Sequence, residues 1–150
     1  MKRLLIFLIV ATIATSAFAQ IKGNTLGIRL GGGNWFTFEA SYQHAMASNQ
    51  RIQADMGILA SGKTGFALSG SYHWVMPIES SFNFFVGPSV RIGAKHDEFL
   101  FGIAPQLGTE YWFTNAPFQL SVDFRPGLGV NHGTFFMWDV MFGMRYVFGK

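Results

Sequence analysis

The closing stretch of the chain, residues 135–148, alternates in side-chain character with a period of two. One set of positions is apolar or aromatic throughout, and it consists of Phe136, Trp138, Val140, Phe142, Met144, Tyr146 and Phe148. The other set is mixed and contains Asp139 and Arg145. Because a β-strand turns successive side chains to opposite faces, this pattern predicts a strand with one apolar face and one partly charged face. A run of about 13 residues far exceeds the roughly 5–6 of a typical globular strand, and this length favours a tilted strand that crosses a membrane.

Seven earlier runs repeat the alternation between turn-forming clusters: residues 24–31, 35–44, 51–60, 66–75, 82–92, 99–112 and 118–128. Every connection between runs is short, so strands that are adjacent in sequence must pair antiparallel. No run shows a sustained period of 3.6 residues. Closing such a sheet removes its free edges. The sequence therefore predicts an all-β chain that forms an eight-stranded, antiparallel, up-and-down transmembrane β-barrel with short turns.

Residues 1–19 have the features of a cleaved signal peptide. A Lys-Arg pair at 2–3 precedes an apolar run over residues 4–14, which is too short to cross a membrane as a helix. The Ala-Phe-Ala sequence at 17–19 fits a cleavage site. We therefore expect an exported mature chain, residues 20–150, that forms one barrel domain. A retained membrane anchor is the alternative.

The composition supports a membrane barrel over other exported classes. Apolar residues make up 49% of the chain, charged residues only 13%, and there is no cysteine. Small exported domains with little core usually carry disulfides, so this chain must be held together in another way. No later stretch approaches the ~18 consecutive apolar residues of a spanning helix. Lysine and arginine form no cluster, which argues against nucleic acid as a partner.

Charged residues identify the inner face of the predicted barrel. Ten of them fall on the less apolar face of the strands and none on the apolar face: Arg29, Glu39, Arg51, Asp55, Arg91, Glu110, Asp123, Arg125, Asp139 and Arg145. Arginine suits buried contacts with carboxylates, whereas lysine suits solvated ends, and the lysines fall in turns or at termini: Lys22, Lys63, Lys95 and Lys150. A soluble ligand-carrying barrel would need the reverse arrangement. Because side chains fill an eight-stranded lumen, we expect a polar lumen with a neutral, paired charge network.

Aromatic residues gather near the predicted strand ends. One group lies on the side of the chain termini: Tyr42, Trp74, Phe82, Tyr111, Phe113, Phe118, Tyr146 and Phe148. The other lies on the opposite side: Trp35, Phe36, Phe66, Phe99, Phe101, Phe136 and Trp138. This distribution predicts two interfacial girdles facing lipid. Core aromatics of a soluble β-sandwich are the alternative.

Three prolines, Pro88, Pro105 and Pro126, fall within the runs and on the apolar register. A proline cannot donate a hydrogen bond to the ladder, and a closed barrel has no free edge to accommodate it. We therefore expect bulges or local breaks at these positions.

The Ala-Phe-Ala signal end, the dyad repeats, the segments GIAPQLGTEYWF and FQLSVDFRPG and the aromatic closing strand resemble the small eight-stranded outer-membrane β-barrel proteins, the OmpX/OmpA-transmembrane-domain type. The resemblance covers residues 20–150. It implies localisation in the outer membrane, contact with outer-membrane lipids, recognition of the C-terminal strand by the barrel-insertion machinery, and a monomer. Family members usually end on an aromatic residue, whereas here Gly149 and Lys150 follow Phe148.

The sequence predicts no catalytic, cofactor-binding or metal-ligating set. Ser71 and His73 both face inward in the predicted register, so a lipid-modifying hydrolase is one alternative. A narrow pore for small solutes is another, although the balanced charges favour a plugged lumen. Residues 31–33 form a glycine turn with no helix after it, unlike a phosphate loop. The remaining histidines are scattered over turns and a strand end: His44, His96 and His132. We expect an outer-membrane barrel with a structural or unspecified interaction role.

Overall fold

The eight predicted strands are all present and close into one barrel. The computed structural model describes residues 2–3, 21, 23–61, 63–79, 81–95 and 97–149, so the predicted signal peptide lies outside the described residues apart from positions 2–3. The strands are β1 (Asn24–Gly33), β2 (Phe36–Ala47), β3 (Gln50–Ser61), β4 (Lys63–Pro77), β5 (Phe82–Lys95), β6 (Glu98–Trp112), β7 (Phe118–Val130) and β8 (Thr134–Phe148).

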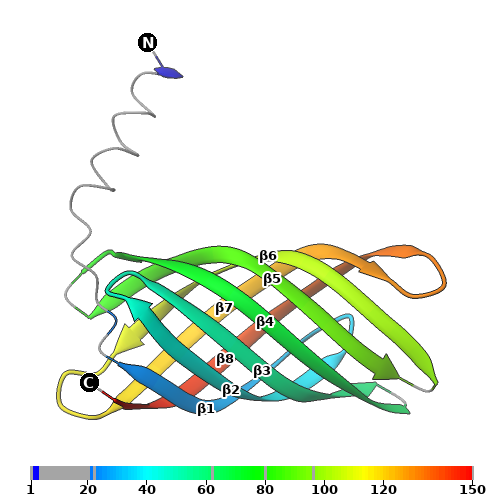
Figure 1. Cartoon of the computed structure of the whole chain (residues 1–150), viewed down its shortest axis with the longest axis horizontal. Helices are drawn as coiled ribbons and strands as arrows, with labels where there is room; N and C mark the ends of the chain where they lie inside the picture. The colour runs from blue at the N-terminus through cyan, green and yellow to red at the C-terminus, as the bar shows by residue number, and fades with distance from the viewer. Residues whose placement is uncertain are drawn as a thin grey trace.

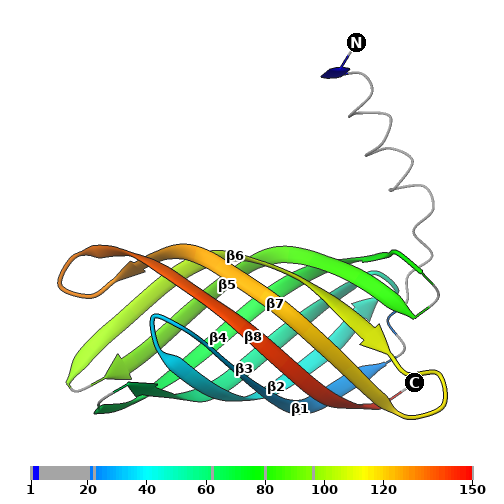
Figure 2. The same cartoon turned by 180° about the vertical axis from the view of Figure 1, so that it is seen from behind.

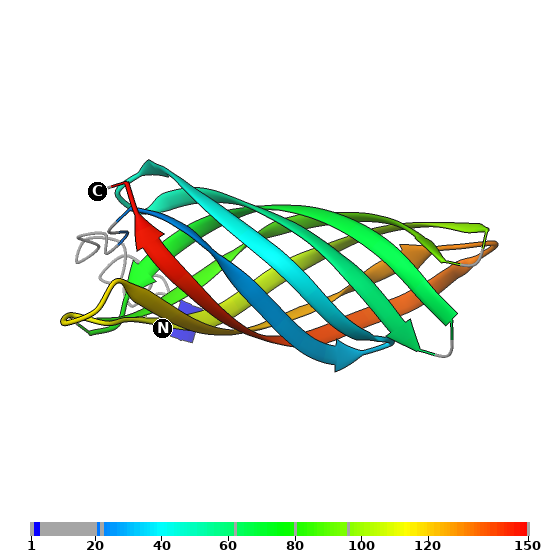
Figure 3. The same ribbon diagram turned by 90° about the horizontal axis from the view of Figure 1, so that it is seen from below.

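Each strand pairs antiparallel with its neighbours in sequence, and β8 pairs with β1 to close the barrel. Figures 1 and 2 show the strands inclined to the long axis, as closure of a sheet requires. The predicted up-and-down topology is confirmed. The start of β1 and the end of β8 lie at the same end of the barrel, here called the terminal end (Figure 3). The hairpins that join β1 to β2, β3 to β4, β5 to β6 and β7 to β8 form the far end.

Most strands extend beyond their predicted bounds. Gly32 and Gly33, predicted to form a turn, belong to β1 and pair with Val140 and Asp139 of β8. β5 likewise continues to Lys95, which the sequence predicts to lie in a turn. The reason is that a ladder continues as long as both strands offer backbone groups, whatever the turn propensity of their side chains. The hairpins at the far end are correspondingly short.

The prolines interrupt the ladders without shifting them. Pro88 lies in an interrupted stretch of the β4–β5 ladder, and Pro105 and Pro126 lie opposite each other in an interrupted stretch of the β6–β7 ladder. The pairings on the two sides of each interruption keep the same register. Local breaks at the prolines are therefore confirmed. The register shifts elsewhere, between Ala45 and Ala47 of β2, which the sequence did not indicate.

Alternate residues of each strand point into and out of the barrel. On β8 the outward Phe142 is 48% exposed and its inward neighbour Met141 is 0% exposed. The outer surface is apolar around the whole barrel, with exposed leucine, isoleucine, valine, methionine and aromatic side chains on every strand. Among the described residues, no helix is long and apolar enough to cross a membrane.

The aromatic residues of both predicted girdles lie at least partly exposed on the outer surface, with one exception. Trp35 was predicted to face outward, and this is wrong. Its ring packs edge to face on Phe135, with 5.9 Å between ring centroids, and both rings cover the inward residues Leu59 and Leu100. Trp35 precedes β2 on the register of the inward Thr37 and Glu39, and the open barrel end offers apolar contacts for its ring.

Candidate functional site

The lumen is the candidate functional site, because the ten charged residues singled out in the sequence all point into it. None of them is more than 4% exposed. They come from every strand except β4, which contributes the inward Ser69, Ser71 and His73. The folded barrel therefore brings together charges that are far apart in the sequence.

A central cluster holds three arginines and four carboxylates: Arg29, Arg91, Arg125, Glu39, Asp55, Asp123 and Asp139. Arg29 forms ion pairs with three of the carboxylates, Glu39, Asp55 at 3.2 Å and Asp123 at 2.5 Å. Arg125 binds Asp139 through two parallel hydrogen bonds, the geometry in which arginine and carboxylate pair most strongly.

The contacts of Glu39 join the two halves of the central cluster. Its Oε1 atom accepts hydrogen bonds from Nη2 of Arg91 and from Nη2 of Arg125, each at 3.2 Å, while its Oε2 atom pairs with Arg29. Arg91 also donates to Asp139 at 2.7 Å. With four negative and three positive groups, the cluster carries a formal charge of −1.

A second ion pair lies nearer the terminal end. Nη2 of Arg51 is 2.6 Å from Oε2 of Glu110, and the guanidinium carbon of Arg51 lies 4.9 Å from the ring centre of Phe85. Glu110 also accepts hydrogen bonds from Trp112 Nε1 at 2.7 Å and from Gln119 Nε2 at 3.2 Å. The carboxylate is thus held from several strands at once.

His73 and Gln106 connect this ion pair to the central cluster. Nε of Arg51 donates to Nδ1 of His73 at 3.2 Å, and Nε2 of His73 lies 3.0 Å from Oε1 of Gln106. The Gln106 amide nitrogen donates to Asp123 at 2.9 Å, so its oxygen must be the acceptor toward His73. The network therefore assigns the proton to Nε2 of a neutral His73.

Arg145 departs from the predicted pairing. Among the described residues, it is the one lumen charge with no opposite charge within 4 Å. Neutral oxygens hold its guanidinium instead: Ser41 at 3.0 Å, Gln119 at 3.1 Å and Ser121 at 2.8 Å. Its positive charge matches the formal charge of −1 on the central cluster. Charge balance is therefore reached over the whole lumen and not pair by pair.

Inward glycines provide the room for these long side chains. Gly57 of β3 lies opposite Glu39 of β2, and a Cβ atom on Gly57 would lie 2.5 Å from Cγ of Glu39. A Cβ atom on Gly143 would lie 2.9 Å from Nη1 of Arg145 and 3.1 Å from Cγ of Arg29. Any larger residue at these positions would displace a charged side chain.

Buried apolar side chains flank the charged network at both ends of the lumen. At the far end, Leu59, Ala67 and Leu100 form a buried cluster under Trp35 and Phe135. The layer at the terminal end is mixed: its buried apolar side chains are Val75, Phe85, Trp112 and Val147, and the polar Thr25 and Asn83 are buried beside them. The sequence predicted a polar lumen and missed these apolar side chains, although all seven residues fall on the inward register near strand ends.

The residues considered for chemistry do not form a nucleophile–base pair. The hydroxyl of Ser71 donates to the hydroxyl of Ser89 at 3.0 Å, while both ring nitrogens of His73 are occupied by Arg51 and Gln106. Within the described part of the chain, no three histidine, aspartate or glutamate side chains are placed to hold a metal ion.

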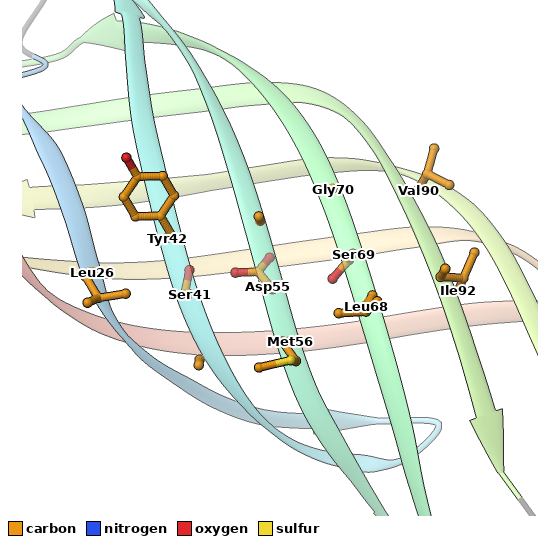
Figure 4. A pocket seen from close by; sticks show the side chains of 12 residues that line it. Leu26, Ser41, Tyr42, Asp55, Met56, Leu68, Ser69, Gly70, Val90 and Ile92 are labelled. Carbon is orange, nitrogen blue, oxygen red and sulfur yellow. The ribbon is translucent and has the colours of Figure 1, made fainter.

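Several hollows lie on the outer surface and not in the lumen, and two of them are large. The first, of about 540 Å³, is lined by the small residues Ala40, Ala54 and Gly70 and by larger side chains. Among the larger ones, Tyr42 lies on β2 and Met56 on β3 (Figure 4). The second, of about 650 Å³, lies over the interrupted ladders at the prolines.

Three solved structures share this fold with the chain. The N-terminal β-barrel domain of Pseudomonas aeruginosa OprF matches with a TM-score of 0.67 and 12% identity, over 83% of this chain and 96% of that one. Neisserial surface protein A matches with a TM-score of 0.60 and 12% identity, over 83% of this chain and 94% of that one. A de novo designed transmembrane β-barrel matches with a TM-score of 0.58 and 13% identity, over 85% of this chain and 96% of that one.

No protein-family model and no curated protein matches the sequence. At 12–13% identity the structural matches show the fold alone. They confirm the predicted resemblance at that level: the chain has the fold of the small eight-stranded outer-membrane barrels.

Proposed function

We propose that this chain is an integral outer-membrane β-barrel protein with a structural or interaction role and without catalytic activity. The observation that carries the proposal is the inverted polarity of the barrel: ten charged side chains are buried inside while large apolar side chains cover the outside. A soluble monomer rarely exposes an apolar patch larger than a few hundred Å². A surface that is apolar on all eight strands fits hydrocarbon instead of water.

The lumen supports a closed barrel over the narrow-pore alternative. A network of ion pairs and hydrogen bonds fills its middle. Buried apolar side chains flank the network at both ends, interleaved at the terminal end with the buried Thr25 and Asn83. An ion that entered would have to separate buried pairs and pass both layers. The occupied ring nitrogens of His73 likewise count against the hydrolase alternative, because a general base needs a free nitrogen facing the nucleophile.

Because the hairpins are short, the surfaces that remain open to partners are the outer face and the two rims of the barrel. At the far end the barrel has no long loop among its described residues that could serve as an adhesin surface. We propose outer-membrane lipids as the main partner, the barrel-insertion machinery as a transient partner through β8, and a monomeric state. Phe148 supports the second proposal, because it is the last residue of β8 and pairs with Asn24.

The test uses the full chain, expressed in a Gram-negative host and recovered from its membrane fractions. We expect the chain in the outer membrane, shortened by the 19 residues of the predicted signal, and protease-resistant after transfer into phosphatidylcholine vesicles. We also expect no discrete conductance in planar bilayers and no phospholipid or lipid A turnover.

Other outcomes point to the alternatives. Recovery as a soluble monomer without detergent would overturn the membrane assignment. Discrete conductance steps would establish the pore. Lipid turnover that disappears in His73→Ala would establish the hydrolase.

A further inference from the structure

The three prolines form a single row around the barrel. Pro88 of β5 pairs directly with Pro105 of β6, the register of β6 and β7 places Pro105 opposite Pro126, and Pro126 pairs with Trp138 of β8. All three prolines lie on the outward register near the middle of their strands. Neighbouring strands thus lack backbone N–H groups at paired positions.

This row leaves backbone carbonyls without donors. In an antiparallel ladder the N–H and C=O groups of one residue point to the same neighbouring strand. Each proline here is paired on one side and unpaired on the other: Pro88 loses its pairing toward Tyr72, and Pro105 and Pro126 lose theirs toward each other. Because proline has no N–H group, the carbonyls of Tyr72, Pro105 and Pro126 face no donor across the ladder.

A hollow of about 650 Å³ lies directly over these interruptions. Its outward walls include Trp74, Val90, Ile103 and Leu128, and Pro88 and Pro105 form part of its floor. The inward residues at the same place are small, with Gly87, Ala104 and Gly127 among the lining. No charged side chain lines the hollow, so a charged ligand would find no counter-charge there.

We propose that this hollow binds an alkyl amphiphile that carries a neutral hydrogen-bond donor, a hydroxyl group, deep along its chain. The apolar walls accommodate the alkyl chain, and the hydroxyl supplies a donor to the carbonyl of Pro105, which is the one of these three residues that lines the hollow. The inference rests on the proposed insertion into a membrane, where no water reaches these carbonyls from the hydrocarbon side. Because the prolines lie near the middle of strands that would cross the membrane, the row lies near the bilayer centre. In a hydrocarbon core of about 30 Å, this corresponds to a hydroxyl about 12 carbons from the headgroup.

The experiment compares three fatty acids in phosphatidylcholine vesicles that contain the inserted barrel: 12-hydroxystearate, 2-hydroxystearate and stearate. The variant Trp35→Phe/Trp138→Phe keeps Trp74 at the hollow and Trp112 buried in the lumen, away from membrane quenchers. Dibromostearate quenches Trp74, and each fatty acid is titrated to reverse the quenching. We expect 12-hydroxystearate to do so at a concentration about fivefold to tenfold lower than stearate, the factor that one net hydrogen bond provides. We expect 2-hydroxystearate to behave as stearate does.

The matched variant Pro105→Ala/Pro126→Ala restores two backbone donors and removes the need for a ligand hydroxyl. It should lose the preference, while Pro117→Ala, in the turn before β7, should keep it. If the double variant fails to insert, Pro126→Ala alone restores the donor that faces the carbonyl of Pro105 and must weaken the preference.

Equal competition by all three fatty acids in the inserted barrel overturns the inference, and so does a preference that persists in the proline variants. Failure of the parent chain to insert into vesicles contradicts the proposed membrane function instead. The two failures are therefore distinguishable.

Discussion

Arg125 and Asp139 are direct partners across the β7–β8 ladder, and their side chains meet inside the barrel in a bidentate contact. Nε of Arg125 is 2.9 Å from Oδ1 of Asp139, and Nη2 is 2.9 Å from Oδ2. The same carboxylate accepts from Arg91 on β5. One aspartate therefore ties an adjacent strand and a remote strand to β8.

Asp139→Ala should lower the free energy of unfolding by about 3–5 kcal/mol, because it leaves two buried arginines without this partner. Asp139→Asn should cost less, since the amide keeps one acceptor oxygen of the same shape. Urea unfolding in vesicles, followed by tryptophan fluorescence, measures both. A near-zero effect of Asp139→Ala would show that the lumen admits enough water to solvate the arginines.

Asp123→Ala and Arg145→Ala should both lower the unfolding midpoint more than Lys63→Ala does. Asp123 belongs to the central cluster, so its loss should cost about 3–5 kcal/mol. Arg145 has only neutral partners, and its loss should cost about 1–3 kcal/mol for the hydroxyl and amide groups left unpaired. Lys63 is at the start of β4 in a far-end hairpin, and its replacement should stay within about 0.5 kcal/mol. Equal, negligible effects of all three would contradict the inward assignment.

Phe85→Ala/Trp112→Ala should create a measurable ion leak in planar bilayers. The two buried side chains form much of the apolar layer at the terminal end, and Trp112 also donates to Glu110. Trp74→Ala removes an outward ring of similar size and should cause no ion leak. If the double variant folds but shows no ion leak, the charge network alone blocks the lumen.

Pro105→Ala/Pro126→Ala should raise the free energy of unfolding. Each proline restricts the unfolded chain by about 0.4–1 kcal/mol, which the variant forfeits. The two restored hydrogen bonds lie in hydrocarbon, where an unsatisfied backbone group costs several kcal/mol, so the stabilisation they provide exceeds that loss. A lower unfolding midpoint would indicate that other donors already satisfy these carbonyls.

Phe148→Ala should reduce the amount of folded barrel in the outer membrane, while removal of residues 149–150 should leave it unchanged. Phe148 ends β8, and its ring lies 6.3 Å from that of Tyr42, centroid to centroid. The folded fraction is measured by heat-modifiable migration of membrane extracts. If the truncation raises assembly, the two residues after the aromatic residue mask the recognition signal.

Strand alternation and the placement of charges were sufficient to predict the topology and the inner face. Both depend on local rules: a period of two fixes which residues share a face, and buried charge on the lipid side is too costly to occur. The partner choices could not be predicted. Arg29 of β1 meets Asp123 of β7 only because the strands tilt and close, and no short-range pattern reports that juxtaposition.

The remaining departures arise where the chemical character of a side chain was weighed above its register. Trp35 shares the register of the inward Thr37, but its aromatic ring at a strand end suggested an outward girdle position. Arg145 was expected to have a carboxylate partner, but the serines and glutamines on neighbouring strands satisfy it first. The apolar layers were missed because each consists of single residues from several strands.

The contact between Gly57 and Glu39 has a consequence for how such a sequence can diverge. A Cβ atom at 57 would lie 2.5 Å from Cγ of Glu39 and also 2.5 Å from the backbone carbonyl oxygen of Phe38. Aspartate at 39 would keep the Cγ atom, and no change of side chain moves the carbonyl oxygen. Among homologues, position 57 should therefore remain glycine whichever acidic residue stands at 39, and Gly57→Ala should not be rescued by Glu39→Asp.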